Sequence, residues 1–217
     1  MKRILFLSLA LLFGCTITAA VWYYTRLKPR SQSVHSITAV SNRQLMTRLH
    51  GYANPLLSYA KQHKYNTSTC FLVDMSIESG KNRFFVYDLK KNAVVDAGLV
   101  AHGRCNNNWL TGRKYGNDVG CGCTSLGKYK IGNPYTGRFG RAYKLHGLDT
   151  TNSNAFKRFV VLHSYTAVPN AEVDPLPICQ SDGCPMVSAA FLQKLGKLID
   201  QSPKPILLYI FDKTSEL

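Results

Sequence analysis

Short runs of hydrophobic residues, many of them alternating with polar ones, dominate the chain after residue 70 and predict β-strands. The predicted strands are residues 71–75, 83–89, 93–101, 128–131, 141–145, 159–163 and 206–211. Lys90-Lys91-Asn92 predicts a hairpin turn between the second and third of them. Strands and helices do not alternate regularly. The pattern therefore predicts a mainly β domain with helices at its edges.

Helical signals are confined to two regions. Ser41 can cap a helix that runs to about His50, and Asn54-Pro55 is typical of the start of a second helix, because proline is tolerated in the first turn. A third helix is predicted at residues 187–201, with Ser188 or the turn before it as the cap. Residues 41–65 are thus a helical lead-in, and the polar, aperiodic residues 25–40 are predicted to be a linker.

An uncharged hydrophobic segment, residues 4–24, follows Lys2 and Arg3. Its length of about 20 residues suits a membrane anchor, a prediction favoured by the aromatic residues 22–24 at its end. Cys15 after Gly14 leaves open a lipoprotein signal, and a cleaved signal peptide is a third alternative. Each alternative places the domain outside the cytoplasm.

The domain organisation follows from these segments. Residues 1–24 are predicted to be a signal anchor or signal peptide, residues 25–40 a linker, and residues 41–217 a single catalytic domain with its core at 70–211. With 45% hydrophobic residues, the chain can build a substantial core. Its oligomeric state is not predicted.

The formal net charge of +15 is compatible with nucleic acid, anionic lipid or an acidic polymer as a partner. The positive residues are scattered, and no nucleic-acid recognition motif accompanies them. We therefore expect no nucleic-acid partner, and a contact with the membrane through the N-terminal segment.

The seven cysteines suit an exported protein, in which disulfides can persist. Cys105 is expected to pair with Cys121 or Cys123, whose one-residue gap is poor for a zinc knuckle. No metal and no cofactor are expected. If Cys15 and Cys184 are set aside, five cysteines remain, so at least one further thiol must be unpaired.

The candidate chemistry lies in Ser181-Asp182-Gly183-Cys184-Pro185 and in the apolar run that ends at His163. Glycine before cysteine permits a tight turn, and the apolar run predicts a buried strand that carries an imidazole at its tip. A cysteine nucleophile needs a base such as histidine close by. Because 21 residues separate Cys184 from His163, the fold has to bring them together.

Two further groups are needed for thiol catalysis. The backbone near Ser164 is the predicted orienter of the His163 ring, because no carboxylate is an obvious partner. The amides of Gly183 and Cys184 are the predicted oxyanion donors, and such donors contribute about 10²–10³ in rate.

From about residue 70 to 211 the chain resembles the L,D-transpeptidase catalytic (YkuD-like) family, and within it the murein-transpeptidase branch. The resemblance is carried by pieces that occur in order. They are Asp74-x-Ser76 with Arg83 and Tyr87-Asp88-Leu89, Ala101-His102-Gly103, Thr124 to Tyr129, Leu145 to Asp149 with Asn154, Arg158-x-Val160-Val161-Leu162-His163, and Ser181-x-Gly183-Cys184-Pro185.

The resemblance implies an L,D-transpeptidase-type β-sandwich with peripheral helices. It also implies that Cys184 is the nucleophile, that His163 is the base, and that a backbone carbonyl near Ser164 holds the imidazole. The implied reaction is acyl transfer on the peptide stems of peptidoglycan, and the implied substrate-binding residues are His146, Ser181 and Asp182.

Two features depart from the family pattern. Asp182 stands where many members have histidine, and an anion beside the cysteine disfavours the thiolate. The long gap between His163 and Cys184, with its three prolines, predicts a lid-like loop. An L,D-carboxypeptidase that uses water as the acceptor and a non-catalytic peptidoglycan-binding domain remain the alternatives.

Overall fold

A computed structural model describes residues 34–213, with side chains from residue 42 onward. The hydrophobic segment 4–24 lies outside the described residues. Within residues 34–213, no helix combines the length and hydrophobicity that a membrane crossing requires. Met46–Leu217 form one compact unit that holds every described strand, whereas residues up to Leu45 belong to a separate unit.

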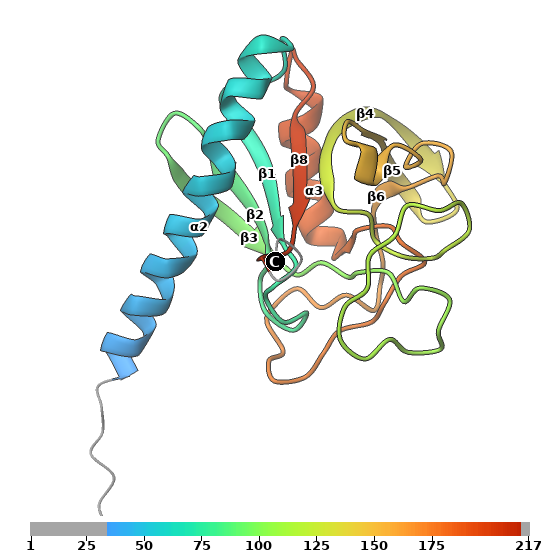
Figure 1. Ribbon diagram of the computed structural model, residues 1–217, viewed down its shortest axis with the longest axis horizontal. Coiled ribbons are helices and arrows are strands. Elements are labelled where there is room, and N and C mark those ends of the chain that lie inside the picture. The colour runs from blue at the N-terminus through green and yellow to red at the C-terminus, as the bar shows by residue number, and fades with distance from the viewer. Residues whose placement is uncertain (1–33, 214–217) are drawn as a thin grey trace, which may run out of the picture. The chain divides into compact units, whose positions relative to one another are not determined.

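The strands join in one mixed eight-stranded sheet, so the predicted mainly β fold class is confirmed (Figure 1). Their order is β3-β2-β1-β8-β4-β5-β6-β7. The β1–β8 and β6–β7 pairs are parallel and the other pairs are antiparallel. The strands are β1 (Thr69–Asp74), β2 (Phe84–Asp88), β3 (Ala93–Gly98), β4 (Gly127–Gly137), β5 (Gly140–Gly147), β6 (Val161–Ser164), β7 (Met186–Val187) and β8 (Leu207–Phe211).

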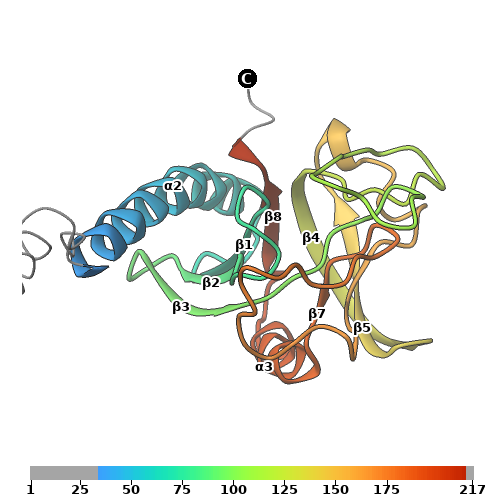
Figure 2. The same cartoon turned by 90° about the horizontal axis from the view of Figure 1, so that it is seen from below.

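In the first half of the sheet, strands β3, β2, β1 and β8, alternate residues face two different helices. Phe71 and Leu208 point into the main core, which also contains Leu195 of α3 (Ala189–Asp200). On the opposite face, Tyr52 of α2 (Val34–Gln62) stacks on Phe211 with ring centroids 3.7 Å apart. Helix α3 and the part of α2 from Met46 onward therefore cover opposite faces of this half (Figure 2).

A single core joins both halves of the sheet. Val73 and Phe84 from the first half share one buried cluster with Tyr129, Leu145 and Leu162 from the second. The cluster is continuous because β1, β8 and β4 are hydrogen-bonded neighbours that carry it from one half to the other. The strands thus form one continuous sheet from β3 to β7 with a shared buried face.

Helix α2 is continuous where the sequence predicted two helices. Pro55 lies inside it, and the helix begins at Val34, within the predicted linker. Leu49, Ala53 and Leu56 are fully or almost fully buried at helical spacing. Their burial stabilises the helix across the proline, whose ring faces the carbonyl of a glycine, Gly51.

The other boundaries differ modestly. Ser188 does cap α3, because its side chain accepts a hydrogen bond from the Phe191 amide. Residues 186–187, however, form the short strand β7 rather than the start of the helix. A 3-10 turn, η2 (Thr150–Asn152), was not predicted. Strands β4 and β5 extend beyond their predicted ends as a long hairpin.

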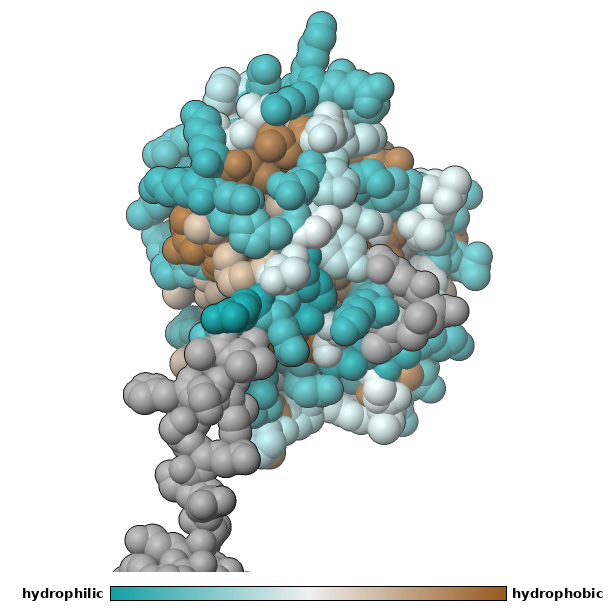
Figure 3. Space-filling view, turned by 60° about the vertical axis from the view of Figure 1, so that its left-hand side comes forward, coloured by the Kyte–Doolittle hydropathy of each residue, from teal (hydrophilic) through white to brown (hydrophobic). Residues whose placement is uncertain are grey.

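Two long connections lie against each other at one end of the sheet (Figure 1). The segment after β3 and the segment before β7 are joined by bridges from Ala101 to Met186 and from Gly103 to Ser181. Within the first of these connections, a Cβ atom on Gly103 would lie 2.4 Å from the Gly122 carbonyl oxygen, so the close approach of this loop to itself requires glycine. The molecular face in Figure 3 is mainly hydrophilic, with hydrophobic residues in small patches between hydrophilic ones.

Candidate active site

Strand pairing brings the two candidate catalytic residues to the same place. In the parallel register of β6 and β7, His163 lies opposite Met186, and the His163 amide donates to the Pro185 carbonyl at 3.5 Å. Cys184 directly precedes Pro185, so the turn of residues 181–184, called the nucleophile turn below, lies at the side of β6. Both His163 and Cys184 line a pocket of about 500 Å³.

The pocket draws its lining from four parts of the chain. They are the loop after β3, the β4–β5 turn, the end of β6, and the segment that leads into β7. The lining residues are Arg104, Asn108, Trp109, Arg138, Phe139, His163, Tyr165, Cys179, Gln180, Ser181, Asp182, Cys184 and Met186.

The imidazole of His163 is held in one orientation. Its Nδ1 lies 2.9 Å from the Ser164 carbonyl oxygen, so the predicted backbone contact is present. A carbonyl accepts only, so Nδ1 carries the proton and the neutral ring keeps a lone pair on Nε2. The ring also stacks on Phe139, with centroids 4.7 Å apart. Burial lowers the pKa of His163, against a smaller opposing effect of the Ser164 carbonyl, so the ring is neutral at pH 7.

The thiol of Cys184 is protonated at rest. Burial raises the pKa of Cys184 above its ordinary value; the Val161 amide and the Arg158 charge lower it, and Asp182 adds a smaller increase. The thiol therefore needs a base to become a nucleophile at neutral pH. A neutral imidazole lining the same pocket is suited to that task.

The turn before Cys184 is fixed by Gly183 and Ser181. Gly183 has φ +111°, and a Cβ atom there would lie 2.7 Å from the Cys123 carbonyl oxygen. The Gly183 amide donates to Ser181 Oγ at 3.1 Å instead of pointing freely into the pocket. Its role as an oxyanion donor therefore stays a prediction, and it requires that the hydrogen bond from the Gly183 amide to Ser181 Oγ breaks first. The Cys184 amide has no hydrogen-bond partner among residues 34–213.

Asp182 is exposed and paired. Its carboxylate accepts from Arg104 Nε at 2.8 Å, and its side chain is 73% exposed. An exposed and neutralised carboxylate perturbs a neighbouring thiol weakly. This explains why the anion beside the nucleophile adds only the smallest of the effects on the pKa of Cys184.

Arg158 is a residue whose role the sequence did not reveal. Its guanidinium donates to the carbonyls of Gly116 and Cys123 and to the Ser125 hydroxyl. The same group lies 3.1 Å from where a Cβ of Gly183 would be. Arg158 thus links the long loop after β3, residues 99–126, to the nucleophile turn. It also places a positive charge near Cys184. The sequence showed it only as the first residue of the segment that ends at His163.

His146 is not among the residues that line this pocket. It stands on β5 four residues beyond Ala142, the partner of His163, which is about 13 Å along a strand. Its ring stacks on Phe156 with centroids 4.8 Å apart. Of the three predicted substrate-binding residues, the pocket therefore includes Ser181 and Asp182.

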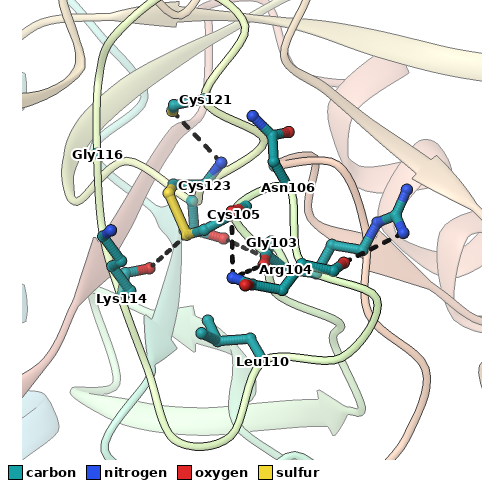
Figure 4. The surroundings of a disulfide bond; sticks show 12 residues. Gly103, Arg104, Cys105, Asn106, Leu110, Lys114, Gly116, Cys121 and Cys123 are labelled. Atoms are coloured by element: carbon teal, nitrogen blue, oxygen red, sulfur yellow. Dashed lines mark hydrogen bonds between the residues drawn. A yellow bond between two sulfur atoms is a disulfide. The ribbon is translucent and has the colours of Figure 1, made fainter.

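A disulfide links Cys105 to Cys123 and closes the long loop behind the nucleophile turn (Figure 4). The sequence had left Cys121 and Cys123 open as partners. Cys121 keeps a free thiol, and its Sγ accepts a weak hydrogen bond from the Cys123 amide at 3.4 Å. Cys70 and Cys179 are also free, so three thiols besides Cys184 are unpaired where the odd count predicted at least one. Within residues 34–213 no group of histidine, cysteine and acidic side chains is arranged to hold a metal ion.

Comparison with known proteins gives one family match. The model of a family described as the L,D-transpeptidase catalytic domain matches residues 39–211. No curated protein matches the chain.

Similar solved structures include the Ldtfm–avibactam carbamoyl enzyme, with 14% identity, a TM-score of 0.40 and coverage of 66% of this chain and 49% of that one. They also include the helical cell shape determining protein Pgp2 from Campylobacter jejuni, with 13% identity, a TM-score of 0.42 and coverage of 67% and 48%. The chain thus spans about half the length of these proteins.

Proposed function

Because the chain belongs to the L,D-transpeptidase catalytic-domain family, we propose that it modifies peptidoglycan by acyl transfer through a thioester on Cys184. The observation that carries this proposal is the pocket shared by Cys184 and a His163 ring whose Nδ1 is bound to a carbonyl. That bond leaves Nε2 as the basic nitrogen of a neutral imidazole.

The reaction follows from these groups. His163 Nε2 takes the thiol proton while the sulfur attacks the carbonyl carbon of the bond between the third stem residue and a terminal D-alanine. The C–N bond breaks, and the imidazolium returns its proton to the amine of D-alanine. An amine from another stem then attacks the thioester carbonyl and gives a proton to His163 Nε2; the C–S bond breaks, and the imidazolium returns the proton to the sulfur, so Cys184 leaves as a thiol. The Cys184 amide is the free donor for the developing oxyanion.

The test is release of D-alanine from tetrapeptide muropeptides, followed by mass spectrometry. The native protein is expected to release it, and Cys184→Ala to abolish release without loss of folding. Cys179→Ala is the matched control, because this second free cysteine of the pocket has no role in the proposed chemistry. A folded native protein that turns over no stem peptide would refute the proposal.

The acceptor is decided by the products. An amine acceptor yields cross-linked dimers, which we propose as the main products, whereas water yields trimmed monomers and would make the protein an L,D-carboxypeptidase. A carbapenem-type β-lactam should acylate the same sulfur, and a mass increase mapped to Cys184 would support the nucleophile independently of the acceptor.

We further propose that the domain works in the cell envelope, outside the cytoplasm. The support is the hydrophobic segment 4–24 behind two basic residues. Fractionation of cells that carry the full chain should recover it with membranes. Release into the soluble fraction after deletion of residues 4–24 would support an anchor.

A further inference from the structure

A second, smaller pocket adjoins the catalytic one. It has a volume of about 230 Å³, and Trp109 and Gln180 line both pockets. The Gln180 side chain is fixed at the boundary of the two pockets, because its amide makes two 2.8 Å hydrogen bonds with the backbone of Leu110. The function proposed above makes no use of this pocket.

A buried positive charge borders this pocket without a carboxylate partner. Arg83 is fully buried and lines the pocket. Its guanidinium donates to the carbonyls of Val100 and Ile77 and to the His102 ring, and no carboxylate among residues 34–213 forms an ion pair with it. Asp74, a fully buried carboxylate nearby, is paired with Arg48 at 2.6 Å. A buried charge is costly unless it is paired, so a counter-charge is expected here.

His102 supplies an unused donor beside this charge. Its Nδ1 lies 2.9 Å from Arg83 Nη2, and a guanidinium can only donate, so Nδ1 is the acceptor and Nε2 carries the proton. The side chain is 6% exposed, and the buried Nε2 has no hydrogen-bond partner among the described residues. Burial and the charges of Arg83 and Arg113 lower the pKa of His102 to about 4, against a smaller opposing effect of the Gly112 backbone. The ring is therefore neutral. The nearby Gly112 backbone favours the protonated ring slightly but does not meet hydrogen-bond geometry with Nε2, so the N–H can still donate to a ligand.

Arg113 adds a second guanidinium to the lining. Its side chain is 20% exposed, and its Nη2 lies 3.1 Å from a Glu78 carboxylate that is itself 74% exposed. Water therefore screens Glu78 far more than it screens Arg83. With Arg83 and Arg113 positive, Glu78 negative and His102 neutral, the lining keeps one net positive charge.

We propose that this pocket binds a free carboxylate of the peptide substrate, with Arg83, Arg113 and His102 Nε2–H as the groups that recognise it. The inference rests on the function proposed above. Arg113 can match a carboxylate geometrically, because two N–H groups of a guanidinium can meet its two oxygens. Arg83 has one N–H group left on Nη1, because its other four are used by Val100, Ile77 and His102, and it contributes mainly its buried charge. The pocket is well placed for this, since the Ser181 amide, three residues before Cys184, donates to the His102 carbonyl at 2.8 Å.

The first experiment measures anion binding without turnover. Full-length protein in detergent, labelled with ¹⁵N-histidine, is titrated with sodium acetate at constant ionic strength, and His102→Asn identifies the His102 Nε2–H signal. Acetate should shift this signal saturably, and chloride should not. Arg113→Gln should weaken acetate binding about tenfold, as expected for the loss of a charge-assisted hydrogen bond. The matched control is Arg141→Gln, which removes a guanidinium that pairs with Asp200 outside the pocket. Absence of a saturable shift overturns the proposal.

The second experiment separates a substrate carboxylate from a free inorganic anion. Cys184→Ala protein is titrated with a stem tetrapeptide, with the same peptide amidated at its carboxylates, and with inorganic phosphate. A shift of the His102 signal by the free-carboxylate peptide alone supports the proposal. Equal shifts by both peptides, or a response to phosphate alone, overturn it. If the peptide binds here but native protein releases no D-alanine, the proposed function fails and the carboxylate site stands. If native protein releases D-alanine normally but the peptide does not shift the His102 signal, the proposed function stands and the carboxylate site is refuted.

Discussion

At the scale of single residues, the candidate catalytic pair of Cys184 and His163 is uncharged near neutral pH. Burial moves the two pKa values apart, since it lowers that of His163 and raises that of Cys184. A wide pH interval therefore exists in which thiol and imidazole are both neutral. The Nδ1 contact with the Ser164 carbonyl leaves Nε2 as the nitrogen with a lone pair, which is the one that the proposed reaction uses as the base.

The pH dependence of catalysis follows from these directions. The base must be unprotonated, so the acid limb of kcat/KM is expected to have its midpoint below 6.5, the ordinary pKa of histidine. Iodoacetamide alkylation of Cys184, which reports the thiolate, is expected to have its midpoint above 9.0. Both profiles are measured on native protein, with alkylation mapped by peptide mass. An acid limb above pH 7 would contradict the neutral resting pair.

Two charged residues beside Cys184 are expected to shift its alkylation midpoint in opposite directions. Arg158→Gln removes a cation and should raise the pKa of the thiol, whereas Asp182→Asn removes an anion and should lower it by less. Asp182 acts weakly because it is exposed and paired with Arg104.

The two variants control for each other, since both replace a charged group by an amide. Arg158→Gln should also lower the unfolding free energy by about 1–3 kcal/mol, because it leaves carbonyls without their donor. Denaturant unfolding tests this, and Asp182→Asn should leave stability unchanged. Shifts of the same sign in both variants would refute the electrostatic explanation.

At the scale of elements, α2 shows how burial overrides a local signal. Pro55 predicted a break, yet the helix runs from Val34 to Gln62. Leu49, Ala53, Leu56 and Ala60 form a buried stripe on the helix. The stripe supplies apolar burial on both sides of the proline, and this outweighs the loss of one backbone hydrogen bond.

Replacing this proline should stabilise the protein. Pro55 is exposed, so Pro55→Ala leaves no cavity and restores a donor for the Gly51 carbonyl. The expected gain is about 1–3 kcal/mol in unfolding free energy, measured by urea denaturation. Ser58→Ala, at another exposed position of the same helix, is the control and should change stability by less than about 0.5 kcal/mol. A destabilised Pro55→Ala would show that the proline bend is needed for packing.

At the scale of the whole molecule, the long loop after β3 is part of the framework of the candidate active site. The Cys105–Cys123 disulfide closes it, and the Cys123 carbonyl lies against Gly183 and accepts from Arg158. Loop, disulfide and nucleophile turn thus form one contiguous unit behind Cys184.

Removing the disulfide should therefore lower the free energy of unfolding. For a closed loop of this size, 18 residues, the double variant Cys105→Ala with Cys123→Ala is expected to lose about 3 kcal/mol of unfolding free energy. A reductant should destabilise native protein and leave the double variant unchanged. Cys121→Ala is the matched control, because this neighbouring thiol is free. Under denaturing conditions, alkylation should modify two more cysteines after reduction than before it. Equal alkylation would exclude the bridge.

The sequence by itself determined the strand pattern, the capping serine of α3, and the candidate nucleophile and base with its backbone orienter. These depend on local chemistry: alternation along a strand, a side-chain cap, and glycine at a positive φ before Cys184. Only the tertiary structure decided which distant groups meet. It paired Asp182 with Arg104, set Arg158 behind the nucleophile turn, joined Cys105 to Cys123, kept His146 out of the catalytic pocket and engaged the Gly183 amide with Ser181. Such contacts depend on strand register and on the packing of loops far apart in sequence, and no short stretch of residues encodes them.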